Sequence, residues 1–120
     1  MQTRTVSPDG YQNFFDSFSR IYAGNSATFE ILSKDLGAQH EVDEQPLRGI
    51  SYDREGLELH LTASDGTHVV HRIPHPIKVQ IEENESGLIE AIEIESDDDP
   101  TAILHLNPPL ASKLLRGQTL

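Results

Sequence analysis

The chain has 120 residues, no cysteine and a formal net charge of −11 at pH 7. This length suffices for a single domain over residues 1–120 with a buried core, and the lack of cysteine excludes disulfide frameworks, thiolate zinc sites and thiol catalysis. The acidic charge disfavours nucleic acid and anionic membranes as partners, because phosphate groups are bound mainly by Lys and Arg.

A flexible N-terminus over residues 1–8 and one helix over residues 9–24 are expected first. Ser7, Pro8 and Asp9 supply a capping hydroxyl, a proline at the first helical position and an early acid, which is typical of a helix start. Six aromatic or aliphatic side chains then recur at helical spacing: Tyr11, Phe14, Phe15, Phe18, Ile21 and Tyr22. We expect this stripe to clamp the helix over a sheet; an exposed protein-docking face is the alternative.

Segments of alternating apolar and polar residues fill most of the chain from 26 to 106 and predict antiparallel strands. The segments are 27–32, 38–42, 47–52, 57–62, 68–73, 77–82, 88–95 and 102–106. We expect residues 43–46 to break the second segment from the third. Many short strands after one helix indicate a mainly β fold, in which an N-terminal α-helix precedes a strongly bent antiparallel meander or a small barrel of the Sm-like or SH3-like kind. Residues 107–120 are expected to be a tail, either a short helix or disordered.

The clearest of these patterns is the central hairpin over residues 56–76. Its first strand alternates leucines with polar residues, so one face is buried and the other is wet. A two-residue loop would set His60 opposite His71. A three-residue loop, Ser64-Asp65-Gly66, gives instead the pairs Leu57 with Ile73, Glu58 with Arg72 and Leu61 with Val69. We expect this second register, because it sets opposite charges across the strands. It leaves His71 on the leucine face, and His60 and His68 on the wetter face.

Histidine is the residue type that most suggests a site. Four of the six histidines lie in or beside the hairpin, and we take them as candidate ligand-binding residues: His60, His68, His71 and His75. Two histidines on a sheet can bind zinc, but a zinc site needs a third ligand and orienting partners, so no metal ligand and no cofactor is assigned. Ordinary surface histidines and a pH-responsive contact are the alternatives. No catalytic residue is assigned, since the sequence holds no G-x-S-x-G serine, glycine-rich phosphate loop or EF-hand loop.

Nine acidic residues and no Lys or Arg lie between Glu82 and Asp99. We expect a solvated sheet edge that keeps the protein soluble and discourages strand pairing; a docking face for a basic partner and a divalent-cation site are alternatives. No apolar run approaches the ~20 residues that span a bilayer, and the N-terminus lacks the apolar core of a signal peptide. We therefore expect a cytoplasmic protein without a membrane partner.

Five stretches carry a family resemblance: FFDSFSR (14–20), DLGAQHE (35–41), PLRGISYD (46–53), HRIPHP (71–76) and AIEIES (91–96). With these stretches the chain resembles a family of short bacterial proteins classified only as a domain of unknown function. The resemblance implies a compact bacterial domain without an assigned activity, cofactor or catalytic residue. We expect a non-enzymatic protein-binding or regulatory module, with a protein partner or a second copy of the chain. The alternative is a small-ligand or metal-binding protein, or an enzyme, that uses the histidine-rich hairpin.

Overall fold

The computed structural model describes residues 2–33, 37–97 and 100–115, with the backbone alone for residues 38 and 40–43. In these ranges one α-helix, α1 (Tyr11–Tyr22), follows a 3₁₀ turn, η1 (Pro8–Gly10). The strands are β1 (Gln2–Val6), β2 (Ser26–Ser33), β3 (Gly37–Asp53), β4 (Gly56–Thr62), β5 (His68–Ile73), β6 (Pro76–Glu83), β7 (Leu88–Ser96) and β8 (Thr101–Ala111), and a second 3₁₀ turn, η2 (Ser112–Leu115), follows them. The predicted mainly β class with one N-terminal helix is confirmed.

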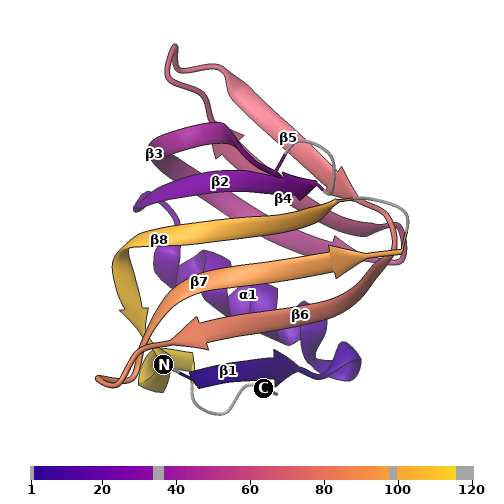
Figure 1. The fold of residues 1–120 in the computed structure, drawn as a ribbon, viewed down its shortest axis with the longest axis vertical. Coiled ribbons are helices and arrows are strands. Elements are labelled where there is room, and N and C mark those ends of the chain that lie inside the picture. The colour runs from indigo at the N-terminus through magenta and orange to yellow at the C-terminus, as the bar shows by residue number, and fades with distance from the viewer. Residues whose placement is uncertain (1, 34–36, 98–99, 116–120) are drawn as a thin grey trace.

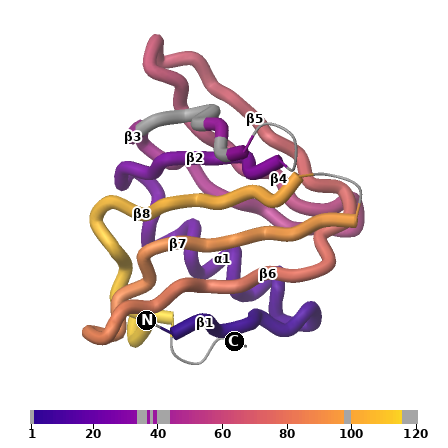
Figure 2. The backbone as a smooth tube through the Cα atoms, in the orientation of Figure 1, coloured from indigo at the N-terminus to yellow at the C-terminus, as the bar shows by residue number. Residues whose placement is uncertain are grey.

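The strands form one eight-stranded antiparallel sheet in the order β1-β6-β7-β8-β2-β3-β4-β5. Two meanders, β2 to β5 and β6 to β8, are joined because β8 pairs with β2, and β1 adds to the outer side of β6 (Figures 1 and 2). Within the described ranges β1 and β5 are open edges, so the sheet is not closed into a barrel. Alternation in a sequence identifies a strand but not its distant neighbour, which is why the sequence left meander and barrel undecided.

Both ends of the described chain differ from the expected flexible N-terminus and tail. Residues 2–6 form β1, which pairs with β6 and buries Val6. In the expected tail, β8 continues to Ala111 and η2 ends at the buried Leu115, so the short-helix alternative describes residues 112–115. Residues 116–120 lie outside the described residues. An edge strand with few apolar residues has no pattern of its own, so its partner strand decides its structure.

The predicted break at residues 43–46 is wrong, because β3 runs unbroken from Gly37 to Asp53. Its first half pairs with β2 as far as Pro46, and its second half pairs with β4 from Leu47 onward. Pro46 has no N–H to donate and lies where the strand changes partners, a position that a proline tolerates. The second half of β3 thus has a free side, along which the end of α1 and the following turn lie. There Leu47 donates its N–H to Asn25 O (2.9 Å) and accepts the N–H of Gly24 (2.8 Å).

The aromatic stripe of α1 is buried against the sheet, as expected of a clamped helix. Phe14, Phe15 and Phe18 are fully buried, and the Phe18 and Tyr22 rings stack with centroids 5.2 Å apart. The Tyr22 hydroxyl lies within hydrogen-bond distance of the carbonyl oxygens of Ser26 (3.0 Å) and Pro108 (2.6 Å). Burial raises the pKa of Tyr22 to about 12. Fully burying each large aromatic side chain is worth about 2–3 kcal/mol, so this stripe accounts for much of the stability.

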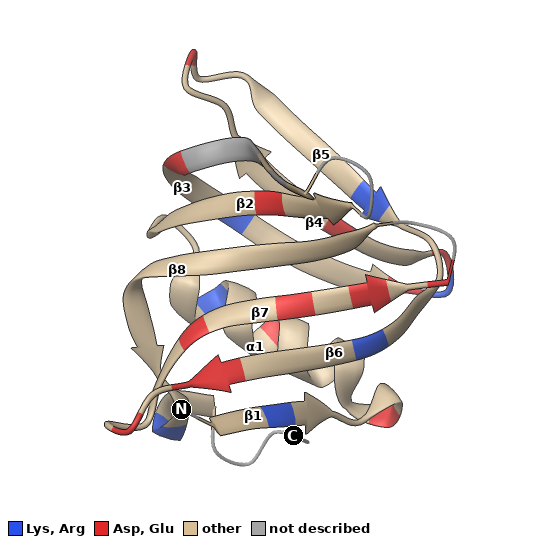
Figure 3. Cartoon of the chain, in the orientation of Figure 1, with Lys and Arg blue, Asp and Glu red and all other residues tan. Residues whose placement is uncertain are grey.

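The sequence predicted that the acidic segment is a sheet edge, and this prediction is wrong. Strands β6 and β7 lie inside the sheet, between β1 and β8. Figure 3 shows acidic residues, in red, along β7 and at the end of β6. Glu93 alternates with the buried Ile92 and Ile94 and therefore lies on the face away from the core. Burial raises the pKa of Glu93, and repulsion by Glu82 and Glu95 raises it further.

Candidate functional site

The central hairpin has the three-residue loop and the register that the sequence predicted. β4 and β5 pair Leu57 with Ile73, Glu58 with Arg72 and Leu61 with Val69. The Ala63 N–H donates to Thr67 O at 2.8 Å, and Gly66 supplies the left-handed residue of the loop with φ 89°. The two-residue loop is therefore wrong. The leucines of β4 are fully buried, and the polar side chains between them lie on the opposite face.

The structure brings together two of the four candidate histidines. His60 Nδ1 lies 3.1 Å from His68 Nε2, and the two ring centroids are 5.2 Å apart. His68 pairs with Thr62, two residues beyond His60 on the same face, so the two rings are diagonal neighbours. His71 lies on the opposite face, its ring centroid 4.9 Å from that of Phe29. His75 is exposed in the turn between β5 and β6.

Arg72 and Glu58 lie next to this histidine pair and carry opposite charges. Arg72 Nη2 lies 2.9 Å from Glu58 Oε2, and Glu58 Oε1 lies 3.3 Å from His60 Nε2. A carboxylate accepts hydrogen bonds, so of the two neutral His60 tautomers it favours the one that carries the proton on Nε2. His60 Nδ1 is then the lone-pair atom, and it is the atom that faces His68.

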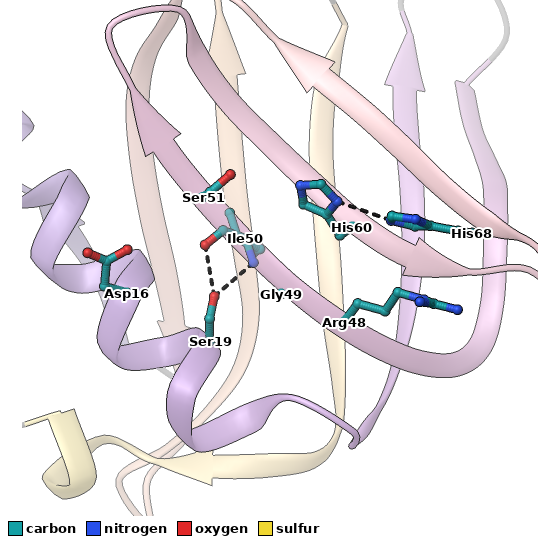
Figure 4. A pocket seen from close by; sticks show the side chains of 8 residues that line it. All are labelled: Asp16, Ser19, Arg48, Gly49, Ile50, Ser51, His60 and His68. Atoms are coloured by element: carbon teal, nitrogen blue, oxygen red, sulfur yellow. Dashed lines mark hydrogen bonds between the residues drawn. The ribbon is translucent and has the colours of Figure 1, made fainter.

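The pair lines one end of a groove of about 390 Å³ that opens to solvent, a volume within the range of ligand sites. Helix α1, β3, β4 and β5 all contribute to its lining: Asp16, Ser19, Arg48, Gly49, Ile50, Ser51, His60 and His68. Figure 4 shows Asp16 and Ser19 on the helix side and the two histidines on the far side of β3. The groove therefore lies where the helix crosses the free side of β3 and meets the polar face of the hairpin.

Ser19 holds the helix wall of the groove in place. Its Oγ accepts the Ile50 N–H and donates to the Ile50 carbonyl oxygen, both at 2.8 Å (Figure 4). These two backbone groups face the free side of β3, where a strand would otherwise pair with them. Gly49 lies beside this link, and a Cβ at this position would make an ordinary van der Waals contact with Ser19 Oγ at 3.5 Å. The hydroxyl is committed to the backbone and is not a free nucleophile.

Arg48 supplies a permanent positive charge near the histidines. Its Nε donates to Thr62 Oγ1 at 3.1 Å, and Thr62 pairs with His68 across the hairpin. Among the described residues no carboxylate forms an ion pair with Arg48. Asp16 supplies the opposite charge on the helix wall, so the groove is positive at one end and negative at the other.

Sequence reasoning found the two histidines but missed the residues that the helix and β3 contribute. Asp16, Ser19, Arg48 and Ser51 join the site only because α1 lies along the free side of β3. One signal pointed there: a glycine within a strand, here Gly49, often marks a close approach of another backbone or a ligand.

The described part of the chain contains neither a metal-binding cluster nor a membrane-spanning helix. No group of three or more His, Asp or Glu residues there is arranged to hold a metal ion. No helix in that part is both long and apolar enough to cross a membrane.

Comparisons with known proteins give a family but no activity. The family of unknown function DUF5335 matches residues 2–114. A protein of Aquifex aeolicus (strain VF5), named only as an uncharacterized protein, is 30% identical over 110 residues, which make up 92% of this chain and 96% of that protein. No solved structure matches the chain. The expected resemblance to a bacterial family of unknown function is confirmed.

Proposed function

The chain belongs to the family of unknown function DUF5335, and we propose that it is a non-enzymatic binding module whose groove receives an anionic group of its ligand. The observation that carries this proposal is the convergence of Arg48, His60 and His68 at one end of the groove. Arg48 bonds to a neutral hydroxyl and has no carboxylate partner among the described side chains, which supports its guanidinium as the group that an incoming anion meets.

The non-enzymatic part of the proposal is supported by how the hydroxyl groups of the groove are used. Nucleophilic catalysis by serine needs a base within hydrogen-bond reach of the hydroxyl. Ser19 is bonded to the backbone of Ile50, and among the described residues no hydrogen bond joins His60 or His68 to a serine. Hydrogen bonding and charge without an activated nucleophile are what a binding site requires.

The anionic group could belong to an acidic segment of a protein partner or to a small molecule, and both carry the same carboxylate or phosphate chemistry. A protein partner agrees with the expected role as a protein-binding or regulatory module in the bacterial cytoplasm. The negative Asp16 on the opposite wall favours a ligand that also carries a hydrogen-bond donor or a cation beyond its anionic group.

The test is an NMR titration of ¹⁵N-labelled protein with inorganic phosphate and, separately, with a tetraglutamate peptide. We expect saturable shifts of the Gly49, Ser51 and His60 amides. Arg48→Gln should weaken binding roughly tenfold, the usual cost of losing a charge-assisted hydrogen bond. Arg54→Gln is the matched control, because Arg54 is exposed outside the groove and its loss should leave binding unchanged.

The two titrations separate the sources of the anion. Tighter binding of the peptide supports an acidic protein segment, and equal or tighter binding of phosphate supports a small molecule. The proposal is overturned if neither probe gives saturable shifts in the groove, or if Arg48→Gln and Arg54→Gln weaken binding equally.

A further inference from the structure

We propose that His60 and His68 form a two-histidine site for a divalent transition metal ion. In a tetrahedral site with metal–nitrogen bonds of about 2.0–2.1 Å, two ligand nitrogens lie about 3.3 Å apart. His60 Nδ1 and His68 Nε2 are 3.1 Å apart. Both rings lie on the same face of one hairpin with a fixed register. One of the two nitrogens carries the proton of the hydrogen bond between them, and that proton must leave the nitrogen before both lone pairs can bind one ion.

The structure supplies the orienting partners that the sequence did not show. Histidine ligands usually turn their other ring nitrogen toward a carboxylate, which fixes the tautomer and makes the ligating nitrogen more basic. Glu58 has this position, with Oε1 3.3 Å from His60 Nε2, and Arg72 holds Glu58 from the other side at 2.9 Å. Together they favour the neutral tautomer whose lone pair is on Nδ1, the atom that faces His68.

The class of metal follows from the donor atoms. Imidazole nitrogens suit Zn²⁺, Cu²⁺ and Ni²⁺, whereas Mg²⁺ and Ca²⁺ prefer oxygen ligands. The described residues offer no third protein ligand beside the pair, so the ion would keep coordination positions open to water or to a ligand in the groove. An ion with open positions can bind a ligand directly, whereas a structural zinc ion has four protein ligands.

This inference goes beyond the proposed function. It shares His60 and His68 with the anion site, but Arg48 has no part in the metal site. A guanidinium repels a metal ion, so Arg48→Gln should leave zinc affinity unchanged or increase it while it weakens phosphate binding. Failure of the metal site and failure of the anion site can therefore be told apart.

The test is isothermal titration calorimetry with Zn²⁺, and with Mg²⁺ for comparison, in a buffer without phosphate. We expect saturable binding of one Zn²⁺ and no binding of Mg²⁺. His60→Ala and His68→Ala should each weaken zinc binding at least tenfold, and Glu58→Gln should weaken it about 10–100-fold, since it removes the charge that orients His60. The matched control is His75→Ala, because His75 is an exposed histidine of the same region outside the groove.

A second measurement protects the test against variants that fold badly. Circular dichroism of each variant checks folding, and histidine ring resonances of the unmodified protein should show both His60 and His68 shifting as Zn²⁺ is added. The inference is overturned if the unmodified protein binds no Zn²⁺, if His75→Ala weakens binding as much as His60→Ala, or if the ring resonances of only one of the two histidines shift.

Discussion

The link between helix and strand at Ser19 can be tested by replacing this serine with alanine. The hydroxyl makes two hydrogen bonds to the backbone of Ile50, a residue that is only 3% exposed. Each hydrogen bond contributes about 1 kcal/mol net, and alanine leaves a backbone donor and an acceptor without partners. We expect Ser19→Ala to lower the free energy of unfolding by about 2 kcal/mol, which for a chain of this size lowers the Tm by roughly 8 °C.

The assay is thermal and urea unfolding followed by circular dichroism. Ser51→Ala is the matched control, since Ser51 is exposed in the same groove, and its loss should change stability by less than about 0.5 kcal/mol. Ser19→Thr keeps the hydroxyl and should retain most of the stability. A loss for Ser19→Ala no larger than that for Ser51→Ala would refute the idea that the serine takes the place of a neighbouring strand.

Two further predictions concern the hairpin and the helix. Gly56→Ala should lower the free energy of unfolding in urea by at least about 3 kcal/mol, because Gly56 has φ 112° and a Cβ there would overlap the Ile73 carbonyl oxygen. A loss under about 1 kcal/mol would contradict the backbone path of the hairpin. Tyr22 has its pKa raised to about 12, so its phenol ionises in the unfolded chain, near pH 10, before it ionises in the folded protein. Stability should therefore fall as the pH rises from about 10 to about 12, and Tyr22→Phe should make this fall shallower; equal slopes for the two proteins would show that Tyr22 is not responsible.

The helix α1 and the β4–β5 hairpin could be predicted from the sequence, because interactions between residues close in the chain determine them. The aromatic stripe of α1 fixed which side of the helix is buried, since the residues at 11, 14, 15, 18 and 22 lie on one side of any α-helix. The hairpin register followed from its loop and from the pairing of Glu58 with Arg72, which lie on the two strands that this loop joins. For the same reason the sequence placed His60 and His68 on one face.

The rest depended on partners distant in sequence. Residues 2–6 form a strand because β6 offers an edge, and β3 continues through Pro46 because β4 replaces β2 as its neighbour. Periodicity records which side of an element is apolar and carries no information on which distant backbone will satisfy its hydrogen bonds.

The groove shows the same division. The sequence determined the two histidines on the wet face of the hairpin, because alternation along a strand is a local property. Only the tertiary structure decided that Ser19 would bond to Ile50 and that Asp16 and Arg48 would face the same groove. The physical reason is that β3 exchanges one strand partner for another and leaves two backbone groups unpaired, and a helix 31 residues away in the chain satisfies them.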